Sequence, residues 1–443
     1  MSAKPPQFVP PAAQALLATA WQAQCDGRLE AAGEGYRQLL AQWPGWAEAH
    51  HRFGLWQYQC GQAEAALASM RHAVALAPER AEWHNDLGNL LAALGRDGEA
   101  AAAFIASLER DVHQAQVWSN LGAVLLRGER AEDALTAFEK AVALDGARAD
   151  AWRNLAAAHT ALGHVLEAAR CECQAYVLPP YDDKPYQMLA TSFYVLGRID
   201  EAAEVYRQWL RIEPAHPIAV HMLAACTVEN VPPRASDAYL EQYFDQASAL
   251  FDSKMCDTLA YRIPALMGEA LAKLALPAGG LSVLDAGCGT GLCGPYLQPW
   301  ARTLTGVDLS PKSLALAADK QCYHHLAQEE IVAHLQCHVA AYDLIASADT
   351  FIYFGALAPF LRAAAGALTP GGWLVASVEE RFADGPFGIT PSGRYNHRQD
   401  YLRAELAASG FTLMALHQVP VRVELGQPVP GLLLLARKAL PTA

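Results

Sequence analysis

The first half of the chain repeats itself every 34 residues, and this spacing constrains the fold more than any other feature. Prolines keep it at Pro44, Pro78, Pro180 and Pro214. Glycines keep it, with one of them a residue early, at Gly27, Gly61, Gly95, Gly128, Gly163 and Gly197. Small residues fill a third register at Ala32, Ala66, Ala100, Ala134, Ala168 and Ala202. Large side chains fill a fourth at Tyr36, Met70, Phe104, Phe138 and Tyr206, where only Glu172 departs.

Each 34-residue unit is predicted to be two amphipathic helices. Glycine permits the turn between them, alanine lets the helices approach closely, and proline ends the second helix. The stretch "WSNLGAVLL…AEDALTAFEKAVAL" resembles the tetratricopeptide repeat. After an N-terminal extension over residues 1–12, the resemblance implies six repeats over residues 13–216. They are residues 13–46, 47–80, 81–114, 115–148, 149–182 and 183–216.

Such arrays offer a groove in which a peptide or protein docks. Asn85, Asn89, Asn120 and Asn154 lie on first helices, where their amides can reach an extended peptide backbone. The alternative is that these asparagines only cap turns or face water, and that the array is a scaffold for a homodimer. Both interpretations remain open, and docking of a peptide or protein substrate is the one we favour.

A different pattern begins after the repeats. Residues 217–238 are predicted to form a capping helix and a linker that contains Pro232 and Pro233. From residue 281 onward, short apolar runs alternate with amphipathic segments. We expect strands near residues 281–286, 303–308, 326–330, 342–349, 373–379, 412–424 and 429–438. The alternation predicts a doubly wound, mostly parallel seven-stranded sheet, with the last two strands as an antiparallel edge hairpin, in a domain over residues 239–443.

The glycine-rich turn "VLDAGCGTGLCG" follows the first of these strands. A dinucleotide fold requires a third glycine or alanine where Leu292 stands, and a P-loop requires a Gly-Lys-Ser/Thr that is absent. Asp285 before the turn is an awkward neighbour for phosphate and suits a cationic ligand. Asp308 ends the next strand, where a carboxylate can accept hydrogen bonds from both hydroxyls of a ribose.

The segments "VLDAGCGTG" and "LTGVDLS" resemble the class I S-adenosylmethionine methyltransferases. With "PGGWLVASVEE" and "SGRYNH", they are more narrowly similar to bacterial predicted methyltransferases that carry tetratricopeptide repeats. The resemblance implies S-adenosylmethionine as cofactor. It places the following residues around that cofactor: Asp285, Gly287, Cys288, Gly289, Gly291, Asp308, Leu309, Asp349, and either Glu330 or Glu329 at the adenine. Tyr261 and Arg262, which precede the sheet, are predicted to cover the cofactor from the other side.

The methyl acceptor is expected at loops that follow the strands. The polar, aromatic insertion over residues 378–400 is a candidate lid. Within it, His397 is the candidate general base, Tyr395 and Arg394 are candidates for orienting the acceptor, and Glu379 lies nearby in sequence. The alternative is a loop that is tied down by its own hydrogen bonds.

Composition narrows the partners. A formal charge of -13 argues against nucleic acid and membrane surfaces. No apolar run approaches about 18 residues, and no secretory signal is apparent, so a cytoplasmic location with reduced cysteines is predicted. Cys322, His325, His334 and Cys337 have an approximate metal-ligand rhythm, but the segment between them looks helical and no metal is predicted. Three functions remain: a methyltransferase with peptide recruitment, a small-molecule methyltransferase, or an inactive repeat adaptor.

Overall fold

The computed structural model describes residues 9–247, 252, 255 and 259–440, so most of the predicted extension 1–12 lies outside the described residues. The chain divides into two compact units, Met1–Asp182 and Asp183–Ala443. Among the described residues, no helix has both the length and the apolar character to cross a membrane.

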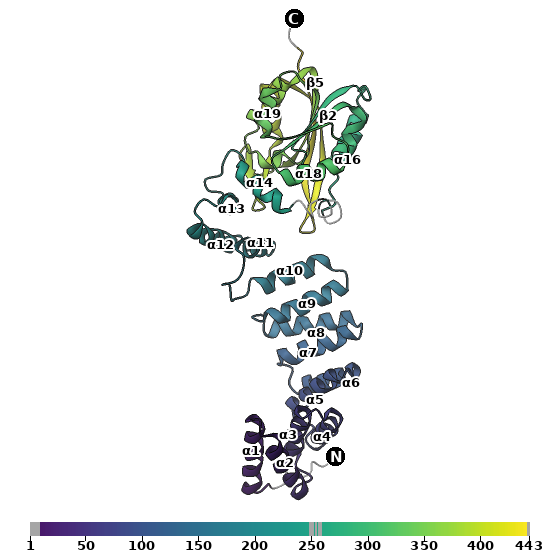
Figure 1. Cartoon of the computed structure of the whole chain (residues 1–443), viewed down its shortest axis with the longest axis vertical. Coiled ribbons are helices and arrows are strands. Elements are labelled where there is room, and N and C mark those ends of the chain that lie inside the picture. Colours follow the sequence, from purple (N-terminus) through teal and green to yellow (C-terminus); the bar gives the residue numbers. More distant parts are fainter. Residues whose placement is uncertain (1–8, 248–251, 253–254, 256–258, 441–443) are drawn as a thin grey trace. The chain divides into compact units, whose positions relative to one another are not determined.

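The first unit is a stack of helix pairs with the predicted 34-residue period (Figure 1). The pairs are α1 (Pro11–Cys25) and α2 (Leu29–Gln42), α3 (Ala47–Gln59) and α4 (Ala63–Leu76), α5 (Ala81–Ala93) and α6 (Asp97–Leu108), α7 (Ala115–Arg127) and α8 (Ala131–Leu144), and α9 (Ala149–Ala161) and α10 (Val165–Tyr176). The tetratricopeptide-like solenoid expected from the sequence is confirmed.

The turn inside each pair needs a left-handed residue, which explains the glycine register. Gly27, Gly61 and Gly95 have φ between 72° and 76°. In the fourth pair this conformation falls on Glu129, with φ 58°, and not on Gly128. The backbone therefore keeps the 34-residue period where the glycine is displaced, and a residue with a Cβ takes a conformation that costs roughly 1–2 kcal/mol.

Close packing inside each pair accounts for the other registers. Ala66, Ala100 and Ala134 are completely buried. A Cβ on Gly88 would lie 2.6 Å from the Phe104 ring, and one on Gly122 would lie 2.6 Å from the Phe138 ring. Phe104 and Phe138 on the second helices therefore occupy the space left by Gly88 and Gly122 on the first helices.

The second unit begins with a sixth helix pair, α11 (Tyr186–Val195) and α12 (Ile199–Ile212). Among the described residues, α13 (Pro217–Thr227), α14 (Asp237–Ala247) and α16 (Ile263–Ala272) follow before the sheet. The exact domain boundaries stay a prediction, but the sixth pair shares a compact unit with the sheet and not with the other five pairs.

A mixed nine-stranded sheet forms the centre of this unit. Its strands are β1 (Leu281–Ala286), β2 (Ala301–Asp308), β3 (His325–Gln328), β4 (Tyr342–Ser347), β5 (Leu368–Glu380), β6 (Phe387–Ile389), β7 (Tyr395–His397), β8 (Phe411–Glu424) and β9 (Gln427–Lys438). The order is β3-β2-β1-β4-β5-β7-β6, and β9 pairs antiparallel with both β5 and β8. The expected parallel core and the antiparallel edge hairpin are both confirmed, but the sheet has nine strands and not seven, because residues 387–389 and 395–397 add β6 and β7.

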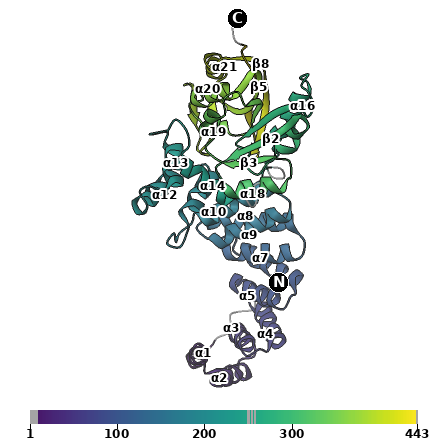
Figure 2. The same ribbon diagram turned by 45° about the horizontal axis from the view of Figure 1, so that its top comes forward.

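Helices cover both faces of the sheet, as in a doubly wound domain. α19 (Ile331–Cys337), α20 (Ala358–Ala367) and α21 (Gln399–Ala408) lie on the opposite side from α16 (Figure 2). α18 (Pro311–Asp319) begins after Ser310, whose side chain accepts a hydrogen bond from the backbone N–H of Ser313 at 3.1 Å. The glycine turn leads into the single-turn helix α17 (Gly294–Leu297).

The polar insertion over residues 378–400 is not a free lid. It forms the small hairpin β6–β7, which packs against the end of the helical segment. His221 on α13 hydrogen-bonds the Gly393 carbonyl at 2.8 Å, and the Tyr395 hydroxyl donates to the Pro232 carbonyl at 2.8 Å. The alternative of a tied-down loop therefore describes this segment, and its partners come from α13 and the linker.

Candidate functional site

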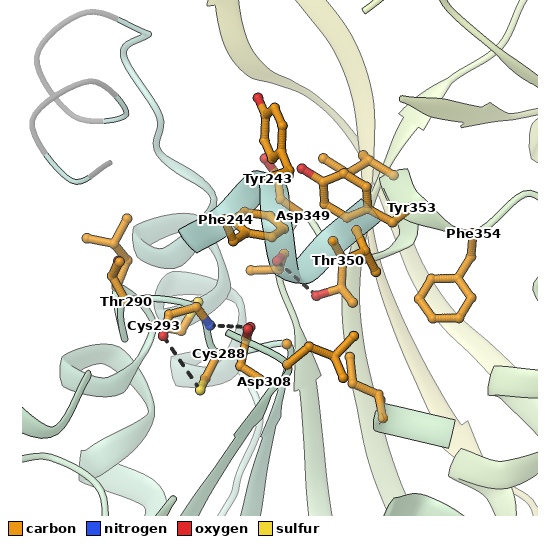
Figure 3. Close-up of a pocket in the computed structure, with 18 of the residues that line it drawn as sticks. Tyr243, Phe244, Cys288, Thr290, Cys293, Asp308, Asp349, Thr350, Tyr353 and Phe354 are labelled. Carbon is orange, nitrogen blue, oxygen red and sulfur yellow. Dashed lines mark hydrogen bonds between the residues drawn. The ribbon is translucent and has the colours of Figure 1, made fainter. Parts of the chain in front are cut away.

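A pocket opens at the carboxyl ends of β1, β2 and β4, where ligands bind in open α/β sheets. One wall is the glycine turn together with Asp308, Leu309 and Glu330. The opposite wall contains Asp349 and Tyr353 together with Arg394 and Arg422. Figure 3 shows Asp308 and Cys288 on one side of the pocket and the rings of Tyr243 and Tyr353 on the other.

The glycine turn brings the backbone at Gly287 and Gly289 to the pocket, next to the side chains of Cys288 and Thr290. Gly287, Gly289 and Gly291 all have positive φ, of 81°, 51° and 84°. A Cβ on Gly287 would clash with the Thr350 side chain, whose Cγ2 would be 2.9 Å away. Glycine is therefore required at residue 287 both for conformation and for space.

Asp308 is held at the mouth of this turn. Its carboxylate accepts hydrogen bonds from the backbone N–H groups of Gly289 and Ser310, both at 2.9 Å. Burial raises the pKa of Asp308, and the backbone donors oppose that shift. Each carboxylate oxygen has a second lone pair, so the fixed carboxylate can also accept hydrogen bonds from vicinal hydroxyls of a ligand.

Asp285 does not line the pocket, which corrects the expectation that it contacts the cofactor. Its side chain is 1% exposed and accepts a hydrogen bond from the Tyr323 hydroxyl at 2.6 Å. Burial raises its pKa to about 7. Asp285 supports the turn from behind. Gly291 and Arg262 are also absent from the pocket lining, whereas Tyr261 lines it.

The structure separates the two candidates for the adenine end. Glu330 lines the pocket and caps α19 through the Ala333 N–H at 2.8 Å. Glu329 is outside the pocket lining and contacts Nδ1 of His334 at 2.8 Å. Nε2 of His334 in turn lies 2.7 Å from the Tyr342 hydroxyl, so both nitrogens of this histidine have partners.

Asp349 lines the pocket just after β4. Its backbone N–H donates to the Ser377 hydroxyl at 2.8 Å, and its carboxylate accepts from that hydroxyl at 3.2 Å. Burial raises the pKa of Asp349 to about 6, although the positive charge of Arg422 opposes the shift. A carboxylate with such a pKa is a competent proton acceptor near neutral pH.

His397 and Tyr395 are not at the pocket, which corrects the predicted general base. His397 is fully buried, and its Nε2 donates to the Phe354 carbonyl at 2.7 Å. Burial lowers its pKa to about 4. Tyr395 is also fully buried and bonded to the linker. The polar character of the insertion reflects these packing contacts and not acid–base chemistry.

Two arginines that line the pocket, Arg394 and Arg422, belong to a cluster of ionic side chains. Arg422 on β8 bonds Glu379 at 2.6 Å and Glu424 at 2.9 Å, and Arg394 bonds Glu424 at 2.9 Å. Arg394 and Glu379 were expected near the acceptor. Arg422 and Glu424 were missed, although a buried-strand pattern interrupted by charge, "VPVRVE", is a signal that could have found them.

The residues on the pocket fit S-adenosylmethionine. The glycine turn leaves room for a ligand to approach the backbone closely. Asp308 is fixed for hydroxyl groups, and Asp349 offers negative charge to a cation. The negative charge in the pocket comes from Asp349 and not from Asp285, so the burial of Asp285 does not weaken this fit.

Comparison with known proteins gives the same two-part description. Residues 284–376 match the family described as "Methyltransferase domain", and residues 54–115 and 119–185 match the family described as "Tetratricopeptide repeat". Three curated relatives are each named "Ubiquinone biosynthesis O-methyltransferase".

The similarity to these relatives is partial. The protein of Hydrogenovibrio crunogenus is 28% identical over 144 residues, which are 29% of this chain and 58% of the relative. That of Aromatoleum aromaticum is 30% identical over 109 residues, or 23% of this chain and 45% of the relative. That of Bordetella avium is 25% identical over 189 residues, or 39% of this chain and 77% of the relative. The chain thus spans about half the length of the first two relatives.

Proposed function

The chain joins tetratricopeptide repeats to a methyltransferase domain, and we propose that it transfers the methyl group of S-adenosylmethionine to a hydroxyl oxygen of a small aromatic molecule. The observation that carries this proposal is a pocket with Asp308 and a glycine turn on one wall and Asp349 on the opposite wall. All three curated relatives are named as O-methyltransferases, which supports oxygen as the acceptor atom.

The cofactor would be held mostly by backbone and carboxylates. The turn over Gly287 to Gly289 would carry the methionine portion, Asp308 the ribose, and Leu309 the adenine face. Glu330 would accept a hydrogen bond from the adenine amine. When bound, the cofactor would supply an electrophilic methyl group on its sulfonium, with neutral S-adenosylhomocysteine as the leaving group.

Asp349 would remove the proton of the acceptor hydroxyl. Because burial raises its pKa to about 6, it is ionised at neutral pH and still basic enough to accept a proton. Its contact with Ser377 fixes the carboxylate, so the acceptor oxygen is oriented as well as activated. Asp349 would therefore be the general base in place of His397.

An aromatic wall supports an aromatic acceptor. Tyr243 and Phe244 on α14 and Tyr353 after β4 all line the pocket. The Phe244 ring lies edge-on to both tyrosines, with centroids 5.5 Å apart in each case. Such a wall excludes water and stacks against a planar ring.

Recruitment of a peptide or protein by the repeats remains a second proposal. Repeat arrays are used chiefly for such contacts. The asparagines are partly occupied, however, because Asn120 donates to Asn89 at 2.9 Å and Asn154 donates to Ser119 at 3.0 Å. This pairing favours the interpretation in which they tie neighbouring repeats together, so we assign the array to partner binding without a peptide-backbone clamp.

The test is calorimetry followed by a transfer assay. Full-length protein is titrated with S-adenosylhomocysteine, and methyl transfer from labelled S-adenosylmethionine to catechols is then measured. Binding without transfer to any hydroxyl compound, but with transfer to a protein, would replace the small-molecule proposal with the peptide one. Absence of binding to correctly folded protein would support the inactive adaptor.

A further inference from the structure

We propose that Arg422 and Arg394 form a subsite for a carboxylate on the acceptor, so that the substrate class is small aromatic hydroxy acids. This inference rests on the proposed function, since it names the substrate of the same pocket. The two arginines lie on the wall of the pocket opposite the glycine turn, and the methyl transfer proposed above uses neither of them.

The first argument is a buried donor without an acceptor. Arg422 is 2% exposed, and its Nε and Nη2 atoms donate to Glu424 and Glu379. Its Nη1 is buried and has no hydrogen-bond partner among the described residues. An unsatisfied buried donor costs about 1–3 kcal/mol, and more when it is charged. Because Arg422 lines the pocket, a ligand oxygen can satisfy Nη1 there.

The second argument is the arrangement of charge around that donor. Glu424 accepts hydrogen bonds from both Arg394 and Arg422, at 2.9 Å each, and so holds the two guanidinium groups on one wall. Arg394 makes this bond through an N–H group on Nη1, and its guanidinium has five N–H groups in total. Guanidinium forks match carboxylate geometry better than any other side chain does.

The third argument places this carboxylate on the acceptor and not on the cofactor. The cofactor residues Asp308 and Glu330 follow β2 and β3, at one end of the sheet order. Arg422 lies on β8, beyond β5 and β9, and Arg394 directly precedes β7. The arginines are therefore on the far side of β4 and Asp349, where the methyl group must be delivered.

Ring and charge together define the ligand. The aromatic side chains Tyr243 and Tyr353 line the space beside the arginines. A planar ring that stacks there, with its carboxylate on Arg422 and its hydroxyl at Asp349, gives the unpartnered Nη1 of Arg422 an acceptor. A neutral phenol of the same shape would leave the Arg422 donor without a partner.

The decisive experiment compares two ligands that differ only in the anionic group. Protein saturated with S-adenosylhomocysteine is titrated with 3,4-dihydroxybenzoate and with 3,4-dihydroxybenzyl alcohol. We expect the benzoate to bind at least tenfold more tightly. Arg394→Gln and Arg422→Lys should each reduce this preference to within about twofold and leave the affinity for S-adenosylhomocysteine unchanged. Arg398→Gln, which removes an exposed arginine paired with Asp400, is the matched control and should retain the preference.

The outcomes separate the two proposals. Equal affinity for both ligands, or binding of neither, overturns the carboxylate subsite. So does an Arg422→Lys protein that loses affinity for S-adenosylhomocysteine but retains the preference, since the arginine would then hold the cofactor. A tenfold preference without methyl transfer overturns the O-methyltransferase proposal and leaves the subsite standing. If Arg422→Lys fails to fold, Tyr194→Phe disturbs Glu424 more gently and must still weaken the preference.

Discussion

The hydroxyl of Tyr194 donates a 2.9 Å hydrogen bond to Oε1 of Glu424, across 230 positions of the sequence. Tyr194 belongs to α11, the first helix of the sixth pair, and Glu424 is the carboxylate that holds Arg394 and Arg422. The sixth helix pair therefore supports, through Glu424, the two arginines that line the pocket.

This contact predicts where the chain can be shortened. Removal of residues 1–182 should leave a folded protein with nearly full affinity for S-adenosylhomocysteine, because the second compact unit stays intact. Removal of residues 1–230 should lower the melting temperature sharply, since it deletes both Tyr194 and His221, the partner of the Gly393 carbonyl. Thermal unfolding of the two truncated proteins checks this, and equal stability of both would contradict it.

The left-handed conformation at Glu129 predicts a stabilising change. Glu129→Gly should raise the free energy of unfolding by about 1 kcal/mol, because glycine removes the Cβ strain at φ 58°. Gly95→Ala, at the equivalent turn with φ 72°, should destabilise by a similar amount. Urea unfolding of both variants measures the difference, and a destabilised Glu129→Gly protein would be inconsistent with the turn described.

Asp349 predicts a pH dependence of activity. A general base must be ionised, so its raised pKa moves the acidic limb of kcat/KM up to about pH 6. Activity should fall tenfold per pH unit below that value. Asp349→Asn should lower kcat by about 10²- to 10⁴-fold, the usual contribution of a general base. A variant that keeps the wild-type rate and pH profile would exclude Asp349 as the base.

The same raised pKa predicts that ionisation of Asp349, which activity requires, lowers the stability of the folded protein. The folded protein binds this proton more tightly than the unfolded chain, whose carboxyl has the ordinary value of 3.8. Ionised Asp349 therefore opposes folding above about pH 6, and this penalty is relieved as the pH falls from 6 toward 4. Asp349→Asn should have a higher melting temperature than the wild type at pH 8, and calorimetry of apoprotein at pH 8 and pH 5 tests whether that gain shrinks in acid.

Local chemistry explains which parts of the structure could be predicted from the sequence. Helix pairs, strands and the Ser310 cap depend on short-range periodicity and turn residues, so they were predictable. Asp285 and His397 were misplaced because their surroundings come from distant residues. The Tyr323 hydroxyl, 38 positions away, donates a hydrogen bond to Asp285, and the Phe354 carbonyl accepts one from His397. A polar residue near a motif does not reveal whether it faces a ligand or another part of the protein.

Gly287 supplies the last prediction. Gly287→Ala should weaken S-adenosylhomocysteine binding at least tenfold and lower stability, because the residue has φ 81° and its Cβ would clash with Thr350. Gly98→Ala is the matched control, since no atom lies within 4 Å of a Cβ at this site in α6. The control should be neutral or stabilising by about 0.5–1 kcal/mol, as for a helical glycine replaced by alanine. Titration calorimetry and thermal unfolding of both proteins measure the two effects, and a Gly287→Ala protein with wild-type affinity would show that the turn does not approach the ligand.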